Sequence, residues 1–185
     1  MNLSVREATA SDIQNIVDYF WNSSPEFLLG MGAEKRKLPH RDTWIDKLQQ
    51  ELVKPYSKKE YYYIIWLLEG QPVGHSNVNA IRFGEQATMH LHIWNAHARK
   101  RGLGTGFLKL TIPSYFKNLQ IQQLICEPFA ENNAPNRTLV KLGFRFIQSY
   151  ETVPGPINFL QKVNRYALER RNLEHFRKPL DGHDD

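Results

Sequence analysis

Residues 89–106 read MHLHIWNAHARKRGLGTG, and this segment decides the fold of the chain. Leu91 and Ile93 alternate with polar or aromatic side chains at a period of two, which predicts a β-strand. A basic, glycine-rich turn follows, and the apolar segment 107–116 after it predicts a helix. A strand, a glycine turn and a helix form an anion site, because glycines allow close backbone approach and the first N–H groups of a helix lack partners within it. The three basic residues at 99–101 make phosphate the expected anion.

The spacing of the glycines distinguishes between kinds of phosphate-binding turn. A nucleotide P-loop needs Gly-x-x-x-x-Gly-Lys-Ser/Thr, which is absent. A Rossmann turn needs Gly-x-Gly-x-x-Gly, whereas Gly102, Gly104 and Gly106 give Gly-x-Gly-x-Gly. The pattern that fits is Arg99-x-x-Gly102-x-Gly104. It resembles the pyrophosphate-binding motif Gln/Arg-x-x-Gly-x-Gly/Ala of the GNAT N-acetyltransferase superfamily.

A second segment, residues 132–144, carries the same resemblance. Many GNATs close their core with Asn-x-Ala-Ser-x-Arg, a helix and Lys-Leu-Gly-Phe, especially the branch that acetylates the N-termini of ribosomal proteins. The matching residues here are Asn132, Ala134, Arg137, Lys141, Leu142, Gly143 and Phe144, and Pro135 stands in place of the usual Ser. The two motifs have the order and the spacing of the family, and the resemblance covers roughly residues 3–168.

The remaining sequence pattern predicts an α/β order of elements. Strands are expected at 3–7, 61–68, 73–81, from about 88 onward, at 121–126, at 144–150 and at 163–169. Helices are expected after an N-cap at Thr9, at 42–53, after the glycine turn, and from about 133 to a stop at Gly143. The resemblance implies a mixed, mostly antiparallel central sheet of about seven strands flanked by about four helices. We expect a single domain over residues 1–169 and a charged, flexible tail over 170–185.

Composition bounds the class of protein. The chain has 185 residues, of which 41% are hydrophobic, which is enough for a substantial core. Its net charge of +5 suits a ligand with several phosphates. No apolar run approaches the ~18–20 residues that would span a membrane, and the first residues lack the apolar core of a secretory signal. We therefore expect a cytoplasmic protein without membrane or nucleic-acid partners, as a monomer or a homodimer.

The resemblance implies acetyl-CoA as the co-substrate. In the family, the pantetheine arm lies between splayed fourth and fifth strands and bonds to the main chain of the fourth, which corresponds here to Ile93, Trp94 and Asn95. The pyrophosphate would lie on the glycine turn, and Asn132 would reach the pantetheine. The other expected cofactor-binding residues are Arg99, Lys100, Arg101, Gly102, Leu103, Gly104, Thr105, Gly106 and Arg137. The alternative for the basic turn is a solvated loop.

The acceptor amine arrives as an ammonium and must lose a proton before it attacks the thioester. Family members often use a Glu at the start of the fourth strand, but counting back from Arg99 places Thr88 there. His90 and His92 follow on the same face of that strand. A histidine with the ordinary pKa near ~6.5 suits a general base at neutral pH, so we expect one of the two to be the base. The alternative is a pair of packed histidines.

The general acid for the leaving thiolate is unassigned. Many GNATs place a Tyr seven residues after the Asn, where this chain has Leu139, and the ribosomal-protein branch places a Ser where it has Pro135. Tyr150, Tyr115 and solvent are the candidates. These departures leave open a non-catalytic acyl-CoA binding module as the alternative to an acetyltransferase that acts on a primary amine, at a protein N-terminus or on a small molecule, by direct attack in a ternary complex.

Three further interpretations compete for the same residues. His90 and His92 could bind a metal with His75 from the preceding strand, although the expected site is metal-free. The single cysteine, Cys126, excludes an internal disulfide and is expected to be plain packing. A nucleic-acid binder would use the basic turn, but aromatic side chains for stacking are missing beside it.

Overall fold

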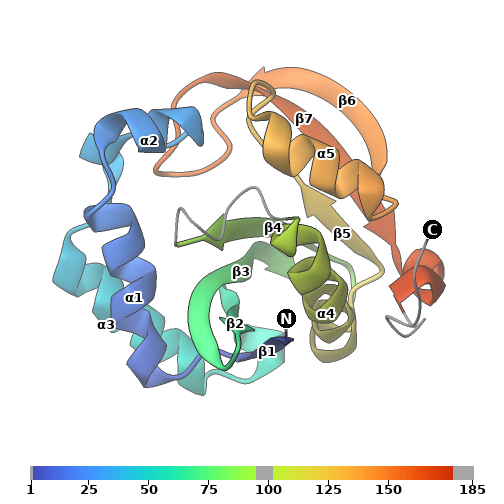
Figure 1. Ribbon diagram of the computed structural model, residues 1–185, viewed down its shortest axis with the longest axis horizontal. Coiled ribbons are helices and arrows are strands. Elements are labelled where there is room, and N and C mark those ends of the chain that lie inside the picture. Colours follow the sequence, from blue (N-terminus) through green and yellow to red (C-terminus); the bar gives the residue numbers. More distant parts are fainter. Residues whose placement is uncertain (1, 95–101, 177–185) are drawn as a thin grey trace.

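The computed structural model describes residues 2–94 and 102–176 (Figure 1). These residues form a seven-stranded sheet with the order β1-β2-β3-β4-β5-β7-β6. The strands are β1 (Leu3–Glu7), β2 (Tyr62–Leu68), β3 (Gln71–Arg82), β4 (Gln86–Ile93), β5 (Gln123–Cys126), β6 (Arg145–Thr152) and β7 (Gln161–Glu169). Neighbouring strands are antiparallel except β4 and β5, which are parallel. The predicted mixed, mostly antiparallel sheet is confirmed.

Helices cover both faces of this sheet. They are α1 (Ala10–Trp21), α2 (Pro25–Gly30), α3 (Arg41–Val53), α4 (Leu103–Leu119) and α5 (Asn133–Lys141). Helices α1 and α3 bury apolar side chains against Ile65 of β2, whereas α4 packs on the opposite face against Trp66. The Trp66 and Phe107 rings stack at 5.0 Å at the centre of the larger core. Two layers of helix therefore enclose the sheet from either side.

Local sequence signals explain most of the helix ends. Thr9 caps α1 through a capping box with Asp12, as its spacing predicts. Helix α5 ends just before Gly143, whose φ of +79° suits glycine. Helix α4 continues through Pro113 to Leu119 rather than ending there. Helix α2 was not expected, and it begins at Pro25.

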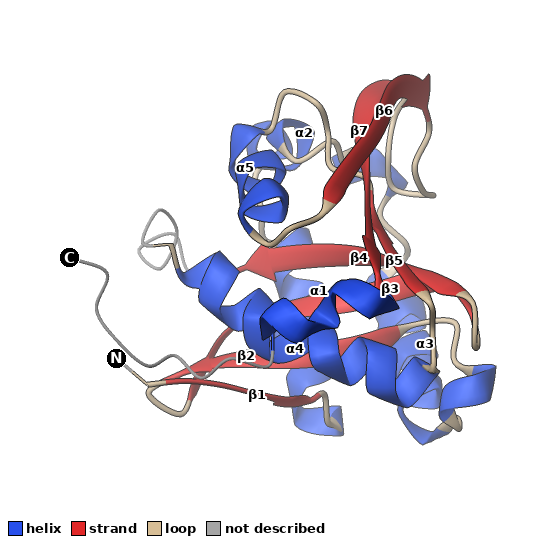
Figure 2. Cartoon of the chain, turned by 90° about the vertical axis from the view of Figure 1, so that its right-hand side faces the viewer, coloured by secondary structure: helices blue, strands red, loops and turns tan. Residues whose placement is uncertain are grey.

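Strands β4 and β5 separate soon after they pair. Their pairing joins Gln86–Thr88 to Gln123–Ile125, three residues on each strand. Figure 2 shows β1 to β4 running side by side across the view, while β7 and β6 rise away from them. Beyond the paired segment, the Cys126 thiol donates a hydrogen bond of 3.1 Å to the carbonyl oxygen of Met89. The strand order and this divergence together position the site.

The chain past β7 continues in ordered contacts. Residues Arg170–Phe176 form a 3₁₀-helix, and the Arg170 guanidinium donates to the carbonyl oxygens of Ile121 (2.8 Å) and Phe116 (2.6 Å). Leu173 also packs against the larger core. Described contacts therefore extend beyond the expected domain boundary at residue 169. Within the described ranges, no helix has both the length and the apolar character needed to cross a membrane.

Candidate functional site

The start of α4 has the features of an anion site. Gly102 precedes the helix with a φ of +70°, a left-handed conformation that favours glycine. Among the described residues, no side chain caps the helix start, so none of them supplies a cap to the first N–H groups of α4. Leu103 is buried and anchors this end of the helix in the core. A side chain added at Gly104 would meet no described atom within 4 Å, so that backbone is open to a ligand.

The third glycine of the turn has a packing role. A Cβ at Gly106 would lie 2.7 Å from the Cδ1 atom of Leu3. The absence of a side chain there lets α4 lie close against β1. The Thr105 N–H donates the first hydrogen bond of the helix to the carbonyl oxygen of Gly102, with an N–O distance of 3.2 Å.

The end of β4 leads into this turn. The Trp94 N–H donates to the carbonyl oxygen of Val73 at 2.9 Å, which keeps β4 paired with β3 up to its last residues. Ile93 packs against the core on the α4 side. Four of the expected cofactor contacts lie outside the described residues, and their roles stay predictions: Asn95, Arg99, Lys100 and Arg101.

Asn132 is fixed at the start of α5 with its side chain unused. It occupies the N-cap position, yet its amide makes no hydrogen bond with the described part of the chain. Its carbonyl oxygen accepts a hydrogen bond of 2.7 Å from the Asn136 side chain, which Tyr166 holds in turn at 3.0 Å. Arg137, one residue further along α5, is exposed and has no ion pair among residues 2–94 and 102–176. No described residue therefore occupies the Asn132 amide.

The two predicted histidines lie on one face of β4, as their alternation indicates. His92 pairs with His75 of β3, and their ring centroids are 4.9 Å apart. The His92 ring also packs at 5.0 Å against Phe20 of α1. His90 lies two residues earlier, with its Nε2 atom 3.1 Å from Asn79 Oδ1. The histidine face is therefore the face that α1 covers.

Burial makes two of the histidines, His90 and His75, weaker bases. It lowers the pKa of His90 to about 4, although the nearby Glu127 carboxylate acts in the opposite direction. Burial, followed by the charge of His90, lowers the pKa of His75 to about 3. His75 is fully buried, and its Nδ1 atom accepts a hydrogen bond of 2.8 Å from Trp94 Nε1. Both imidazoles are neutral at pH 7, and His90 is a weaker base than the ordinary histidine that the sequence suggested.

These lowered pKa values make stability depend on pH. Below pH ~6.5 the unfolded chain binds a proton at each imidazole and the folded chain does not, so the free energy of unfolding falls with pH by about 1.4 kcal/mol per unit for each group. This loss continues down to the folded pKa, about 3 for His75. We expect His75→Gln to flatten the fall between pH 6.5 and 4, as measured by denaturant unfolding. Exposed His40→Gln is the control, and equal slopes in all three proteins would contradict the assignment.

A carboxylate that the sequence did not single out lies just past β5. Glu127 directly follows β5, and its Oε1 atom accepts hydrogen bonds from the Tyr150 hydroxyl and from Arg165 Nη1, the latter at 2.6 Å. Its side chain is 14% exposed. The charge of Glu127 acts to raise the pKa of His90, against the effect of burial. Its position just past the short strand 121–126 was the only signal in the sequence.

The candidates for the general acid differ in their surroundings. Tyr115 is enclosed in the core and donates to Ser76 Oγ at 2.9 Å. Tyr150 is partly exposed, and burial together with its bond to Glu127 raises the pKa of its phenol. Leu139, at the family's Tyr position, is buried in the core. Tyr150 is thus the better placed of the two phenols.

Two of the alternative chemistries find little support in the geometry. No group of three or more His, Cys, Asp or Glu side chains in the described part of the chain is placed to hold a metal ion. The His75 Nδ1 atom is already engaged with Trp94. Burial raises the pKa of the Cys126 thiol to about 12, which keeps it protonated and unreactive.

A depression of about 410 Å³ opens on the histidine side of the sheet. It is lined by residues of α1, by the turn that follows α1, by Phe27 of α2 and by Trp94 at the end of β4. Tyr19 belongs to this lining, and its ring lies 5.5 Å from His92. A molecule bound in the depression would therefore approach the end of β4 beside the histidines.

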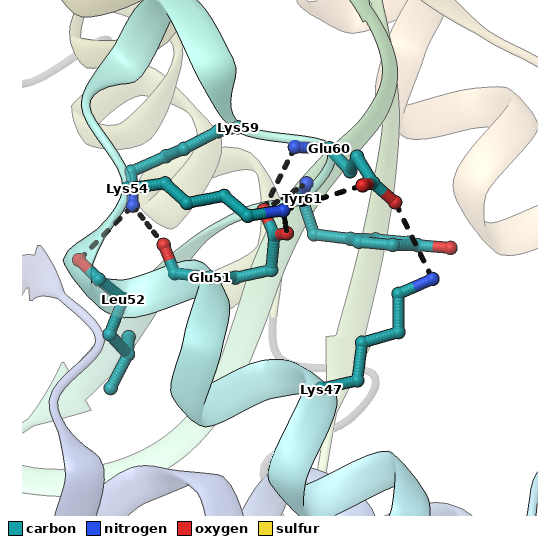
Figure 3. A network of polar contacts seen from close by, with 7 residues as sticks. All are labelled: Lys47, Glu51, Leu52, Lys54, Lys59, Glu60 and Tyr61. Atoms are coloured by element: carbon teal, nitrogen blue, oxygen red, sulfur yellow. Dashed lines mark hydrogen bonds and ion pairs between the residues drawn. The ribbon is translucent and has the colours of Figure 1, made fainter.

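Polar contacts hold the end of α3 against the start of β2. Figure 3 shows the carboxylate of Glu51, near the end of α3, accepting hydrogen bonds from Lys54 and from the N–H groups of Glu60 (2.8 Å) and Tyr61 (3.1 Å). Lys59 donates in turn to the last carbonyl oxygens of α3. Burial would raise the pKa of Glu51, but these hydrogen bonds lower it below its ordinary value. The network ties α3 to β2 and holds the helix in place beside α1.

Comparison with known families gives one extended match. Residues 2–145 match the family model described as Acetyltransferase (GNAT) domain. No curated protein sequence matches the chain.

Solved structures with the same fold include several enzymes. Spermidine N-acetyltransferase from Vibrio cholerae, in complex with CoA and spermine, has a TM-score of 0.76 at 12% identity, over 93% of this chain and 98% of that chain. An aminoglycoside acetyltransferase in complex with coenzyme A and kanamycin has a TM-score of 0.73 at 15% identity, over 96% and 100%. The ribosomal L7/L12 alpha-N-protein acetyltransferase in complex with coenzyme A has a TM-score of 0.73 at 14% identity, over 91% and 94%. At identities this low, these similarities show that the fold is shared and nothing further.

Proposed function

The chain belongs to the GNAT acetyltransferase family, and on this premise we propose that it moves the acetyl group of acetyl-CoA to a primary amine by direct attack in a ternary complex. One observation carries the proposal: the parallel strands β4 and β5 part after three paired residues, and no described side chain caps the start of α4. This arrangement suits an extended ligand that adds to the edge of β4 and ends in phosphates.

Acetyl-CoA is the proposed occupant of this space. Its pantetheine arm would run along the main chain of Ile93, Trp94 and Asn95, and its pyrophosphate would lie on the amides of residues 101–106. Asn132 offers the uncommitted amide on the opposite side. The basic residues 99–101 and Arg137 would add charge-assisted hydrogen bonds. Coenzyme A is also named as a ligand in the three solved structures compared above.

Glu127 is the group that we place next to the acceptor ammonium. Its Oε1 atom carries both the Tyr150 and the Arg165 contacts, and its Oε2 atom accepts no hydrogen bond from the described residues. An ammonium that binds Oε2 can lose its proton to the carboxylate directly or through water. His90 stays in the proposal as the neutral imidazole beside this carboxylate, and His92 as a wall of the acceptor path.

The reaction then needs only proton transfers and one substitution. The deprotonated nitrogen attacks the thioester carbon, the C–N bond forms, and the developing oxyanion is stabilised by an N–H of β4. The C–S bond breaks, and the thiolate takes up a proton from Tyr150 or from solvent. Tyr150 is then reprotonated from solvent, the amide nitrogen loses its second proton to solvent, and Glu127 releases the proton that it accepted to solvent as well.

Turnover on amines separates this proposal from the binding-module alternative. Release of the CoA thiol is measured with acetyl-CoA and a panel that contains an α-amino peptide, spermidine and kanamycin. We expect turnover with at least one amine, and initial-rate lines that intersect because both substrates bind before transfer. Tight binding of acetyl-CoA without turnover on any amine would favour the non-catalytic module. That alternative is based on Leu139 and Pro135, which stand where the family usually has Tyr and Ser.

A further inference from the structure

The depression beside the end of β4 has walls of mixed aromatic and neutral polar character. Tyr19, Phe27 and Trp94 supply three rings, and Asn15, Asn22 and Ser23 supply amides and a hydroxyl. Of the described residues that line it, Asp18 alone is acidic. If the proposed function is right, this lining meets the acceptor before the amine reaches His92 and Glu127.

The one acidic side chain in the lining is already occupied. Asp18 Oδ1 accepts hydrogen bonds from Arg41 Nη2 at 2.8 Å and from Arg41 Nε at 3.2 Å. Asp18 Oδ2 accepts a third from Gln14 Nε2 at 2.7 Å. Both carboxylate oxygens are engaged, and the guanidinium cancels the negative charge. The lining therefore offers a second cationic group of an acceptor no net attraction.

The position of Arg41 is fixed by the fold. It is the first residue of α3, and α3 packs against α1, which carries Asp18. The far end of α3 is tied to β2 through the Glu51 network. Because both helices are held, the guanidinium stays on Asp18 without a ligand to place it there. A fork of two N–H donors on one carboxylate oxygen also constrains the geometry of the pair.

We propose that Arg41 is a specificity-determining residue that confines the acceptor to amines with one positive charge next to an apolar or aromatic group. The inference rests on the proposed function, because it assigns the depression to the acceptor. The rings suit an apolar substituent, and polyamines or aminoglycosides would bring further charges toward a guanidinium. An α-amino group, with a pKa of about 7.7–8.0, is also more readily deprotonated than an alkyl amine near ~10.4.

The test compares two acceptors in the wild-type chain and in Arg41→Gln. The acceptors are a tripeptide with a free α-amine on a first Phe, and spermidine. We expect the wild-type chain to have a kcat/KM for the peptide at least about tenfold above that for spermidine. In Arg41→Gln, the kcat/KM for spermidine relative to the peptide should rise about tenfold, mainly through a lower KM, since Asp18 then meets the second cation. Adding Asp18→Asn should abolish the gain.

The control and the contrary outcomes are distinct. Arg82→Gln removes a guanidinium of the β3–β4 turn that pairs with Glu85, and it should leave the ratio unchanged. A wild-type preference for spermidine, or an equal change for both acceptors in Arg41→Gln, would overturn the inference while leaving acetyl transfer intact. If neither acceptor turns over, the proposal of acetyl transfer to these amines fails. The inference about Arg41 is then tested by calorimetry, which measures the binding of each acceptor to the CoA-bound chain. Peptide binding without spermidine binding supports it, and the reverse or no binding of either overturns it.

Discussion

Glu127→Gln is expected to lower kcat by about 10²–10⁴-fold while acetyl-CoA affinity stays unchanged, because the amide cannot accept the ammonium proton. The amide oxygen can still accept the hydrogen bonds of Tyr150 and Arg165, so the surrounding geometry is largely kept. The deficit should shrink as the pH rises toward the pKa of the acceptor amine, since a neutral amine needs no base. Initial rates between pH 6 and 10 measure this dependence.

The matched control for this variant is Glu151→Gln. Glu151 neighbours Tyr150 on β6, is exposed, and points to the other face of the strand. The Glu151→Gln variant loses the same charge as Glu127→Gln and should keep wild-type activity. If Glu127→Gln retained kcat within about threefold of the wild-type value at pH 7, the carboxylate would not be the proton acceptor and His90 would become the first candidate again.

Gly104→Val is expected to weaken acetyl-CoA binding by about 100-fold or more. Charge-assisted hydrogen bonds are worth about 1.5–3 kcal/mol each, so the loss of two from the helix start reaches this factor. A Cβ at this position meets no described atom within 4 Å, and the new side chain therefore disturbs the ligand rather than the fold. The thermal midpoint should stay at or slightly above the wild-type value, because valine is a better helix former than glycine.

Gly30→Val provides the matched substitution. A Cβ at Gly30, in α2, also meets no described atom within 4 Å, and Figure 1 shows α2 apart from α4. Its acetyl-CoA affinity should equal that of the wild-type chain. Wild-type affinity in Gly104→Val, measured by calorimetric titration, would show that the pyrophosphate does not lie on this backbone.

Local patterns in the sequence anticipated much of the fold. The alternation in β1, the capping box at Thr9 and the glycine after α5 each act within a few residues, and each predicted an element that the structure contains. The two family motifs predicted the sheet that surrounds them. Helix α2 was missed because its six residues give too short a pattern, and α4 continues through Pro113 to Leu119, past the apolar segment 107–116 that predicted it.

The candidate site was harder to predict, because it depends on contacts between distant residues. Glu127 contacts Tyr150 and Arg165, which lie 23 and 38 residues away along the chain. The spacing of these three residues does not predict that they form a cluster. The alternation placed His90 and His92 on one face, but it could not show that burial lowers the pKa of His90 to about 4. Arg41 and Asp18 are likewise joined only by the packing of α3 on α1.

Titration of acetyl-CoA into the wild-type chain by calorimetry tests the central claim most directly. If the parted strands β4 and β5 and the start of α4 form the cofactor site, binding should fit one site per chain with a dissociation constant in the micromolar range. Absence of binding at millimolar acetyl-CoA would contradict the account, because the catalytic proposal and the binding-module alternative both require this site.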